Sequence, residues 1–168
     1  RYVDAVSDSD ARILDTRKTT PGFRALEKAA VLAGGGHNHR MGLYDRAMVK
    51  DNHLAALGSD DALQASIYRL KEQRPKVEVQ LEADTLEWVE RFLKLEGVDH
   101  ILLDNMSNEE LRQAVEMRGT RSSPFFEASG GINLETVAAV ASTGVDFISI
   151  GALTHSAASL DLGLDILD

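Results

Sequence analysis

The chain has 168 residues, a formal net charge of -9, 43% hydrophobic residues and no cysteine. This length suits a single domain with a sizeable core, and the lack of cysteine excludes disulfides, thiolate nucleophiles and cysteine-ligated zinc. No apolar run approaches the roughly 20 residues of a membrane span, and an acidic protein repels nucleic acid. We therefore expect neither a membrane nor a nucleic-acid partner, and a cytoplasmic location is compatible with the composition.

Short apolar segments alternate with segments of helical spacing along the chain. Such alternation is typical of a parallel α/β sheet. About six strands fall short of the eight strands and roughly 250 residues of a complete barrel. The sequence thus favours an open or incomplete parallel β/α barrel, with a doubly wound sheet as the alternative. The predicted strands are 12–17, 47–54, 76–83, 100–105, 124–129 and 145–152, and the predicted helices are 61–74, 84–97, 107–119 and 133–144.

Positive charge is concentrated near the start of the chain. Residues 11–50 contain eight Lys or Arg and three acidic residues, whereas residues 51–168 contain nine Lys or Arg and 21 acidic residues. Charge varies along any chain, but a basic sector in an acidic body also suits a site for a small anion. Such cations would suit several carboxylates or a pyrophosphate. They are Arg17 and Lys18 after the first strand, Arg40 beside His39 in a glycine-rich segment, and Lys50 on the second strand, with Met48 and Asn52 on its face.

Acidic side chains come next. In strand 76–83, Glu78, Gln80 and Glu82 share one face. Burying such side chains inside a barrel is costly unless cations or a metal pair with them. The alternative is an edge strand whose polar face is in contact with water. Asp104 ends the following strand, where α/β active sites are built; a helix cap is the alternative, although Ser107 suits that role better. Glu82 and Asp104 could together hold Mg²⁺.

Glycines follow the last two predicted strands. Small residues there let the backbone approach a ligand, and the helix that follows offers free N–H groups to an anion. Paired glycine turns at the last two strands of a β/α barrel recur as a phosphate site, although turn chemistry alone would also explain them. The residues concerned are Ser129, Gly130 and Gly131 after one strand and Gly151 after the next.

Several long stretches together resemble one enzyme family: DTRKTTPGFRALEKAAV, GGGHNHRMGLYDRAMVKDNHL, ILLDN, and EASGGI with DFISIGALTHS. The family is quinolinate phosphoribosyltransferase, also called nicotinate-nucleotide pyrophosphorylase (carboxylating). The resemblance runs over nearly the whole chain. It implies a Mg²⁺-dependent step of NAD synthesis, in which quinolinate and phosphoribosyl pyrophosphate give nicotinate mononucleotide, pyrophosphate and CO₂.

The resemblance also implies roles for individual residues. Lys50, Glu82 and Asp104 are the expected catalytic residues, and the two acids would bind Mg²⁺ and the ribose hydroxyls. Lys18 would reach the pyrophosphate. The quinolinate carboxylates would be held by Arg17, His39, Arg40 and Lys50, and the 5′-phosphate by Ser129, Gly130, Gly131 and Gly151, with His155 close by.

The chain departs from the family pattern in two respects. The family has an N-terminal domain before this point, so we expect residues 1–168 to form the barrel domain alone. The resemblance implies a homodimer or higher oligomer in which that domain of one subunit covers the partner's barrel site and supplies a further arginine; by itself this chain should be inactive or impaired. Gln80 also replaces the first of two alternating acids, which leaves Glu82 as the metal-side acid, or Glu78 if the register shifts.

Three other interpretations stay open. One is a relative on the same fold, either nicotinate phosphoribosyltransferase or the quinolinate-enzyme-like protein of molybdate operons. Another is a truncated barrel that binds anions without catalysis, and a third is an unrelated phosphate-binding barrel lyase. The cations of NHR and KDNH favour a dicarboxylate and hence quinolinate, and a lyase would leave DTRKTTPG unexplained.

Overall fold

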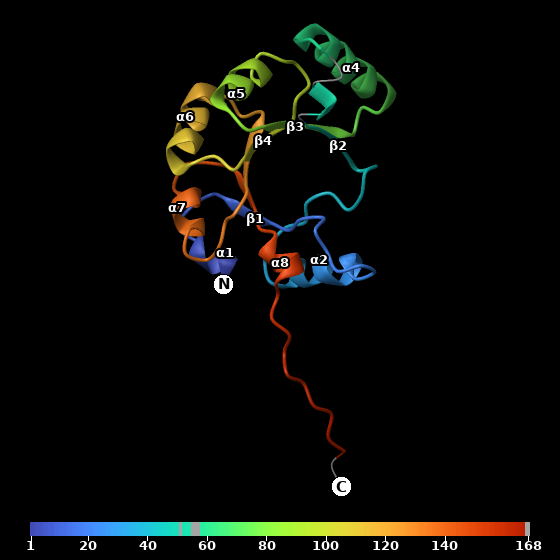
Figure 1. Cartoon of the computed structure of the whole chain (residues 1–168), viewed down its shortest axis with the longest axis vertical. Coiled ribbons are helices and arrows are strands. Elements are labelled where there is room, and N and C mark those ends of the chain that lie inside the picture. Colours follow the sequence, from blue (N-terminus) through green and yellow to red (C-terminus); the bar gives the residue numbers. More distant parts are fainter. Residues whose placement is uncertain (51, 55–57, 167–168) are drawn as a thin grey trace.

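The computed structural model describes residues 1–50, 52–54 and 58–166. Six parallel strands form one sheet in the order β1-β6-β5-β4-β3-β2. The sheet curves around a central space, and helices α4, α5, α6 and α7 follow its outer side (Figure 1). The expected open parallel β/α barrel is therefore confirmed. The strands are β1 Arg12–Leu14, β2 Arg46–Val49, β3 Glu78–Ala83, β4 His100–Asp104, β5 Phe125–Ser129 and β6 Phe147–Ser149.

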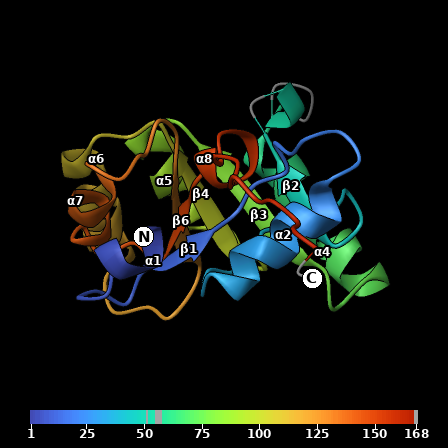
Figure 2. The same ribbon diagram turned by 90° about the horizontal axis from the view of Figure 1, so that it is seen from below.

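The helices begin where the sequence places good caps. Ser107 and Glu110 form a capping box at the start of α6, and Gly119 follows its last residue at φ 65°. The Ser59 and Thr85 side chains cap α4 and α5. Figure 2 shows α6 and α7 at one end of the molecule and α2 and α4 at the other. The helices are α1 Tyr2–Ala5, α2 Arg24–Ala33, α4 Asp60–Gln73, α5 Leu86–Phe92, α6 Asn108–Arg118, α7 Val137–Ala141 and α8 Ala152–His155.

Several elements are shorter than predicted. Helix α5 ends at Phe92, and β1 and β6 are three residues each. Helix α7 occupies only part of the predicted segment 133–144. The reason is local, because the Asn133 side chain accepts hydrogen bonds from the backbone N–H groups of Glu135 and Thr136 and so makes a turn before the helix.

The predicted strand 47–54 is partly wrong. It forms β2, which is four residues long, and Lys50 follows that strand instead of lying on it. Asn52 is exposed in a helical segment and does not share a face with Met48. Position 51 lies outside the described residues.

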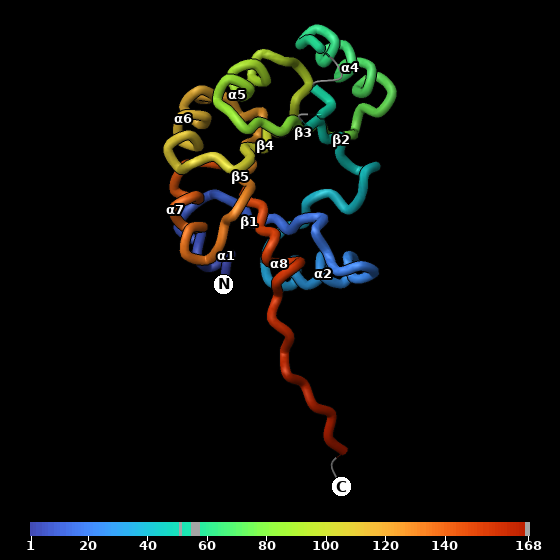
Figure 3. The backbone as a smooth tube through the Cα atoms, viewed as in Figure 1, coloured from blue at the N-terminus to red at the C-terminus, as the bar shows by residue number. Residues whose placement is uncertain are grey.

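The barrel wall is open between β1 and β2, the two edges of the sheet (Figure 3). On the free side of β1, His37 forms a single parallel bridge with Leu14. The chain then turns toward β2, where the Arg40 guanidinium donates to the Arg46 carbonyl at 3.4 Å and contacts the Met48 sulfur at 3.2 Å. A side chain, not a ladder of backbone hydrogen bonds, thus spans this part of the wall.

The two faces of the sheet differ in chemistry. Leu81, Ile101, Phe126 and Ile148 have 0% exposure and belong to the main hydrophobic core. Side chains alternate along a strand, so the alternate positions face the inside of the curve. Many of these are polar, among them Gln80, Glu82, Asp104, Glu127 and Ser149, whereas Leu102 is apolar. No helix in the described part of the chain is both long and apolar enough to cross a membrane.

Candidate active site

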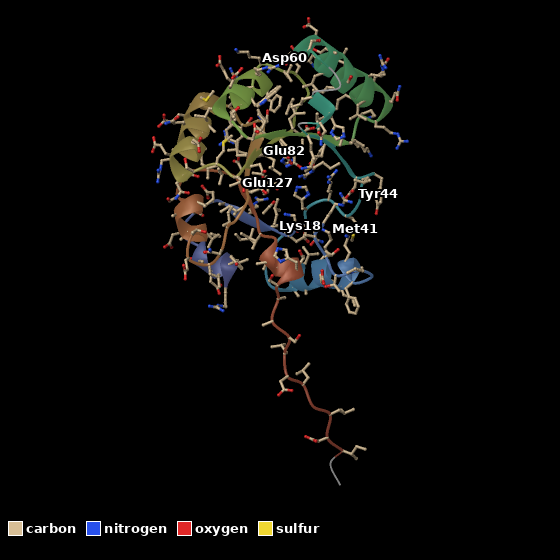
Figure 4. The ribbon with its side chains drawn as sticks, in the orientation of Figure 1. Lys18, Met41, Tyr44, Asp60, Glu82 and Glu127 are labelled. Carbon is tan, nitrogen blue, oxygen red and sulfur yellow. The ribbon has the colours of Figure 1, made fainter. Side chains whose placement is uncertain are left out.

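A cavity of about 440 Å³ lies at the carboxyl ends of the strands. In Figure 4, Glu82, Glu127 and Lys18 point toward the centre of the curved sheet, with Met41 and Tyr44 on its open side. The cavity brings together eight of the twelve residues to which the resemblance assigns roles: Arg17, Lys18, His39, Arg40, Lys50, Glu82, Asp104 and Ser129.

The loop after β1 is held by α2 so that its cations face the cavity. Arg24 on α2 donates to the Arg17 carbonyl at 3.0 Å and to the Thr19 hydroxyl at 3.1 Å. The Lys18 N–H donates to the Thr16 hydroxyl at 3.1 Å. Within the described residues, the buried Nε of Arg17 has no hydrogen-bond partner. An unpaired buried guanidinium nitrogen is costly, so Arg17 is ready to bind an anion.

A second guanidinium faces the same space. Burial and, next, the charge of Arg17 lower the pKa of Arg40. Both effects penalise the charged form of Arg40 when the cavity holds no counter-ion. An anion placed between the two guanidinium groups would relieve their repulsion and could bind each of them in a fork.

Glu127 lies among the residues that line this cavity, and the sequence analysis did not single it out. Its carboxylate is fully buried and accepts hydrogen bonds from Gln80 Nε2 at 2.7 Å and from the Ser149 hydroxyl. The Nε2 atom of His39 lies 3.2 Å from a carboxylate oxygen of Glu127. Burial acts to raise the pKa of Glu127, but the hydrogen bond and charge interaction with His39 and the hydrogen bonds from Ser149 and Gln80 outweigh it. The pKa of Glu127 therefore lies below its ordinary value of 4.5. The alternation of Phe125, Glu127 and Ser129 could have revealed this inward position.

His39 is also held from outside the barrel. Asp15 and Lys28 form an ion pair with exposures of 0% and 1%, between β1 and α2. Asp15 accepts the His39 N–H at 2.8 Å, and the Lys28 ammonium donates to the His39 carbonyl at 2.9 Å. The sequence analysis missed Lys28, since helical spacing alone does not say that its charge is buried.

The acidic side of the cavity is formed by the ends of two neighbouring strands. Glu82 on β3 pairs with Lys50, and Asp104 on β4 accepts a hydrogen bond from the Asn105 amide at 2.8 Å. Asn105 itself has φ 56°. The described residues contain no group of three or more His, Cys, Asp or Glu that could hold a metal. Two carboxylates nevertheless fit Mg²⁺, which keeps several waters and shares its coordination with substrate oxygens.

Glu78 does not reach this cavity. It lies at the amino end of β3, where it pairs with Arg46 at 2.5 Å and with His100 at 3.3 Å. Strand β3 also lies between β4 and β2, so the idea of an edge strand with a solvated face is wrong. Of the two acids considered for the metal side, the structure brings only Glu82 beside Asp104.

The glycine turns lie next to the main cavity. Gly130 and Gly131 line a neighbouring space of about 240 Å³ together with Ser129. Gly130 has φ 100°, and a Cβ there would lie 2.1 Å from Asn105 Oδ1. Gly151 precedes α8, and a Cβ there would lie 2.8 Å from His155 Nε2. Gly151 and His155 therefore lie beside each other but do not line the main cavity.

Comparison with known proteins agrees with the resemblance. Residues 1–165 match the family model described as quinolinate phosphoribosyl transferase, C-terminal domain. The chain is 48% identical over 167 residues to nicotinate-nucleotide pyrophosphorylase [carboxylating] of Mycobacterium leprae, covering 98% of this chain and 57% of that protein. It is 44% identical over 164 residues to the probable enzyme of that name in Bacillus subtilis, covering 98% and 55%.

Solved structures show the same relationship. The structure of NadC from Streptococcus pyogenes matches with a TM-score of 0.84 and 43% identity, covering 99% of this chain and 58% of that one. The chain thus spans somewhat more than half the length of the relatives that it matches. It belongs to the quinolinate phosphoribosyl transferase family and corresponds to the C-terminal domain.

Proposed function

We propose that the protein containing this chain transfers the phosphoribosyl group of phosphoribosyl pyrophosphate to quinolinate with decarboxylation. The observation that carries the proposal is the composition of the cavity at the carboxyl ends of the strands. Four cations, Arg17, Lys18, Arg40 and Lys50, share it with two acids at neighbouring strand ends. Guanidinium and ammonium groups suit carboxylates and pyrophosphate. The family membership and the names of the relatives support this choice.

The proposed chemistry needs positioning and charge more than a protein nucleophile. The pyridine nitrogen of quinolinate attacks the anomeric carbon of the ribose as the bond to pyrophosphate breaks, and positive charge develops on the ribosyl centre. Glu82 and Asp104 supply negative charge for that centre. The quaternised ring then accepts the electron pair of the breaking carbon–carboxylate bond, CO₂ leaves, and a proton replaces it.

Each group of the cavity then has a part in positioning the substrates. Arg17, Arg40 and Lys50 would hold the two carboxylates of quinolinate, with the Arg17 Nε available to accept one of them. Lys18 would reach the pyrophosphate, and Ser129 and the glycine turns would hold the 5′-phosphate. Glu82 and Asp104 would hold Mg²⁺, which when bound offsets the charge of the leaving pyrophosphate.

We also propose a homodimer or higher oligomer, in which an N-terminal domain of the partner subunit covers the cavity and adds an arginine. Exposed apolar side chains on the segments between β1 and α2 and just before β2 support this. Phe23, Leu43 and Tyr44 are 54%, 73% and 76% exposed, and burying them would stabilise an assembly. A cytoplasmic location stays a prediction, since one relative, from Arabidopsis thaliana, is named chloroplastic.

Calorimetric titration with quinolinate and with nicotinate, at low and at high salt, tests the proposal. We expect salt-sensitive binding of quinolinate but not of nicotinate. Arg40→Ala should weaken quinolinate binding about 10- to 100-fold, the effect of one charge-assisted contact, whereas Arg112→Ala, an exposed cation on α6, should change nothing. Equal affinity for the two acids would refute a dicarboxylate site. If neither binds, the titration is repeated with the full-length protein, and a second failure there rejects the function.

A further inference from the structure

Arg24, the first residue of α2, uses all three nitrogens of its guanidinium to hold other parts of the chain. Nε donates to the Thr19 hydroxyl at 3.1 Å, and one terminal nitrogen donates to the Arg17 carbonyl at 3.0 Å. The other terminal nitrogen donates to the Met41 carbonyl at 3.2 Å. None of these three acceptors is a carboxylate. These contacts, here called the Arg24 bridge, join the loop after β1 to the segment that leads into β2.

Both of the joined segments carry a cation of the main cavity. Arg17 lies on the first segment, and Met41 directly follows Arg40 on the second. Arg17 and Arg40 line the cavity, whereas Arg24 is not among its lining residues. The backbone of Met41 is also held from its other side, since its N–H donates to the Asp45 carboxylate at 2.5 Å. In Figure 4, Met41 lies above α2, the helix that begins with Arg24. The Arg24 bridge thus fixes the backbone beside each guanidinium group.

The sheet does not fix the separation of these two guanidinium groups. Arg17 follows β1 and Arg40 precedes β2, and these strands are the two edges of the sheet, so they do not pair with each other. Like charges at short range repel. Burial and, next, the charge of Arg17 lower the pKa of Arg40, which shows that the two charges act on each other. A connection between the two segments is therefore needed to keep both cations facing one cavity.

We propose that Arg24 is a positioning residue that determines ligand specificity. It holds Arg17 and Arg40 at a fixed separation without contacting the ligand, and this separation selects an anion with two adjacent carboxylates. A guanidinium binds a carboxylate in a directional fork, so two guanidinium groups held apart by one distance discriminate between dicarboxylates of different span. The identity of this anion as quinolinate rests on the proposed function.

Arg24→Lys separates the Arg24 bridge from its charge. Lysine keeps the positive charge, but its ammonium is a single point and cannot reach acceptors on both segments as three separate nitrogens do. In calorimetric titration we expect quinolinate binding about tenfold weaker in Arg24→Lys and in Arg24→Met alike, the effect of one misplaced charge-assisted contact. Wild-type affinity in Arg24→Lys would overturn the inference, because charge alone would then suffice.

Arg121→Lys is a matched control for this substitution. Arg121 donates to the Leu93 carbonyl at 3.2 Å and does not line the cavity. The change therefore replaces a guanidinium that binds a backbone carbonyl elsewhere in the fold, and quinolinate affinity should stay within about twofold. A loss as large as that of Arg24→Lys would overturn the inference, because the effect would not be specific to the Arg24 bridge.

Two dicarboxylate probes test the selection by span. Phthalate carries adjacent carboxylates, as quinolinate does, and isophthalate carries them one ring position further apart. The preference for phthalate over isophthalate should fall by about threefold or more in Arg24→Lys, since specificity is the difference between two affinities. A merely structural defect would weaken both probes equally, so an unchanged preference would overturn the role in specificity.

Combination with Arg40→Ala tests whether Arg24 acts by placing Arg40. Once the Arg40 guanidinium is absent, its placement no longer matters, and Arg24→Lys should then weaken quinolinate binding by less than about twofold. A further loss of about tenfold in that background would overturn the inference, because independent sites contribute additively.

A readout without ligand keeps this inference separate from the proposed function. In NMR spectra of the unliganded chain, the amides of Lys18 and Gly42, which follow the two carbonyls bound by Arg24, should both shift in Arg24→Lys and stay in place in Arg121→Lys. A shift of only one amide would overturn the Arg24 bridge. If quinolinate binds neither this chain nor the full-length protein, the proposed function fails, and these spectra still decide whether Arg24 joins the two segments. Urea unfolding of each variant checks that it folds.

Discussion

Lys28→Met would test the buried ion pair behind the cavity. Lys28 and Asp15 are 1% and 0% exposed, so the substitution leaves a carboxylate without its counter-ion and without water. Removing one partner of such a pair costs about 3–5 kcal/mol. That is a large share of the roughly 5–15 kcal/mol by which a domain is stable. The His39 carbonyl would also lose the Lys28 ammonium as its donor.

A double substitution distinguishes the energy of the ion pair from the cost of leaving one of its two charges unpaired. Asp15→Leu with Lys28→Met removes both charges. The main remaining cost is that the backbone N–H and the carbonyl of His39 lose their partners, at about 1–3 kcal/mol for each group left unpaired. The double variant should therefore lose at least about 2 kcal/mol less than the sum of the two single variants. This non-additivity arises because each single variant strands a buried charge, and the double variant strands none.

The measurement is the free energy of unfolding in urea for the four proteins of the cycle. Lys94→Met is a matched control, because its ion pair with Glu90 has exposures of 67% and 61%; we expect a change below about 0.5 kcal/mol. A decrease of less than about 1 kcal/mol in the unfolding free energy of Lys28→Met would show that the ion pair is more accessible to water than its exposures of 1% and 0% indicate. Strict additivity would show that the two charges do not interact.

Two further predictions concern the cavity. Gly130→Ala should lower the affinity for inorganic phosphate in a titration and cost about 1 kcal/mol or more of stability, because an alanine at φ 100° is strained and its Cβ would collide with Asn105; unchanged binding would argue against a phosphate site at this turn. The pKa of Glu127 is depressed below 4.5 in the folded chain, so its contribution to stability is present above pH 4.5 and is lost as the pH falls through the folded pKa. The unfolding free energy of Glu127→Gln should consequently fall less between about pH 5 and pH 3 than that of the unsubstituted chain, and parallel curves would contradict the assignment.

Much of the architecture could be predicted from local patterns. The cap at Ser107 and the end of the helix at Gly119 were predicted because caps depend on neighbours within one helical turn. Period-two alternation correctly turned Glu82 inward, since a strand has the same geometry wherever it lies. The motifs also identified Arg17, Arg40, Lys50 and Asp104, which the structure gathers in one cavity.

Most of the errors came from interactions over longer distances in the sequence, whereas the late start of α7 came from the local side-chain turn at Asn133. The ends of β1, β2 and α7 depend on where neighbouring chain segments pair and on local side-chain turns, which periodicity does not reveal. The internal partners of His39, among them Asp15, Lys28 and Glu127, could not be foreseen because they lie on different segments. Glu127, 88 residues further along, is brought beside it only when the sheet curves.

The amino-acid sequence alone determined the class of fold, the alternation of strands and helices, and the residue types offered to an anion. These depend on interactions between residues close in the chain. Only the tertiary structure decided which acid of β3 reaches the cavity, that Lys28 is buried against Asp15, and that His39 lies beside Glu127. Those outcomes depend on strand order and on the loss of water around each charge, and both are properties of the packed molecule as a whole.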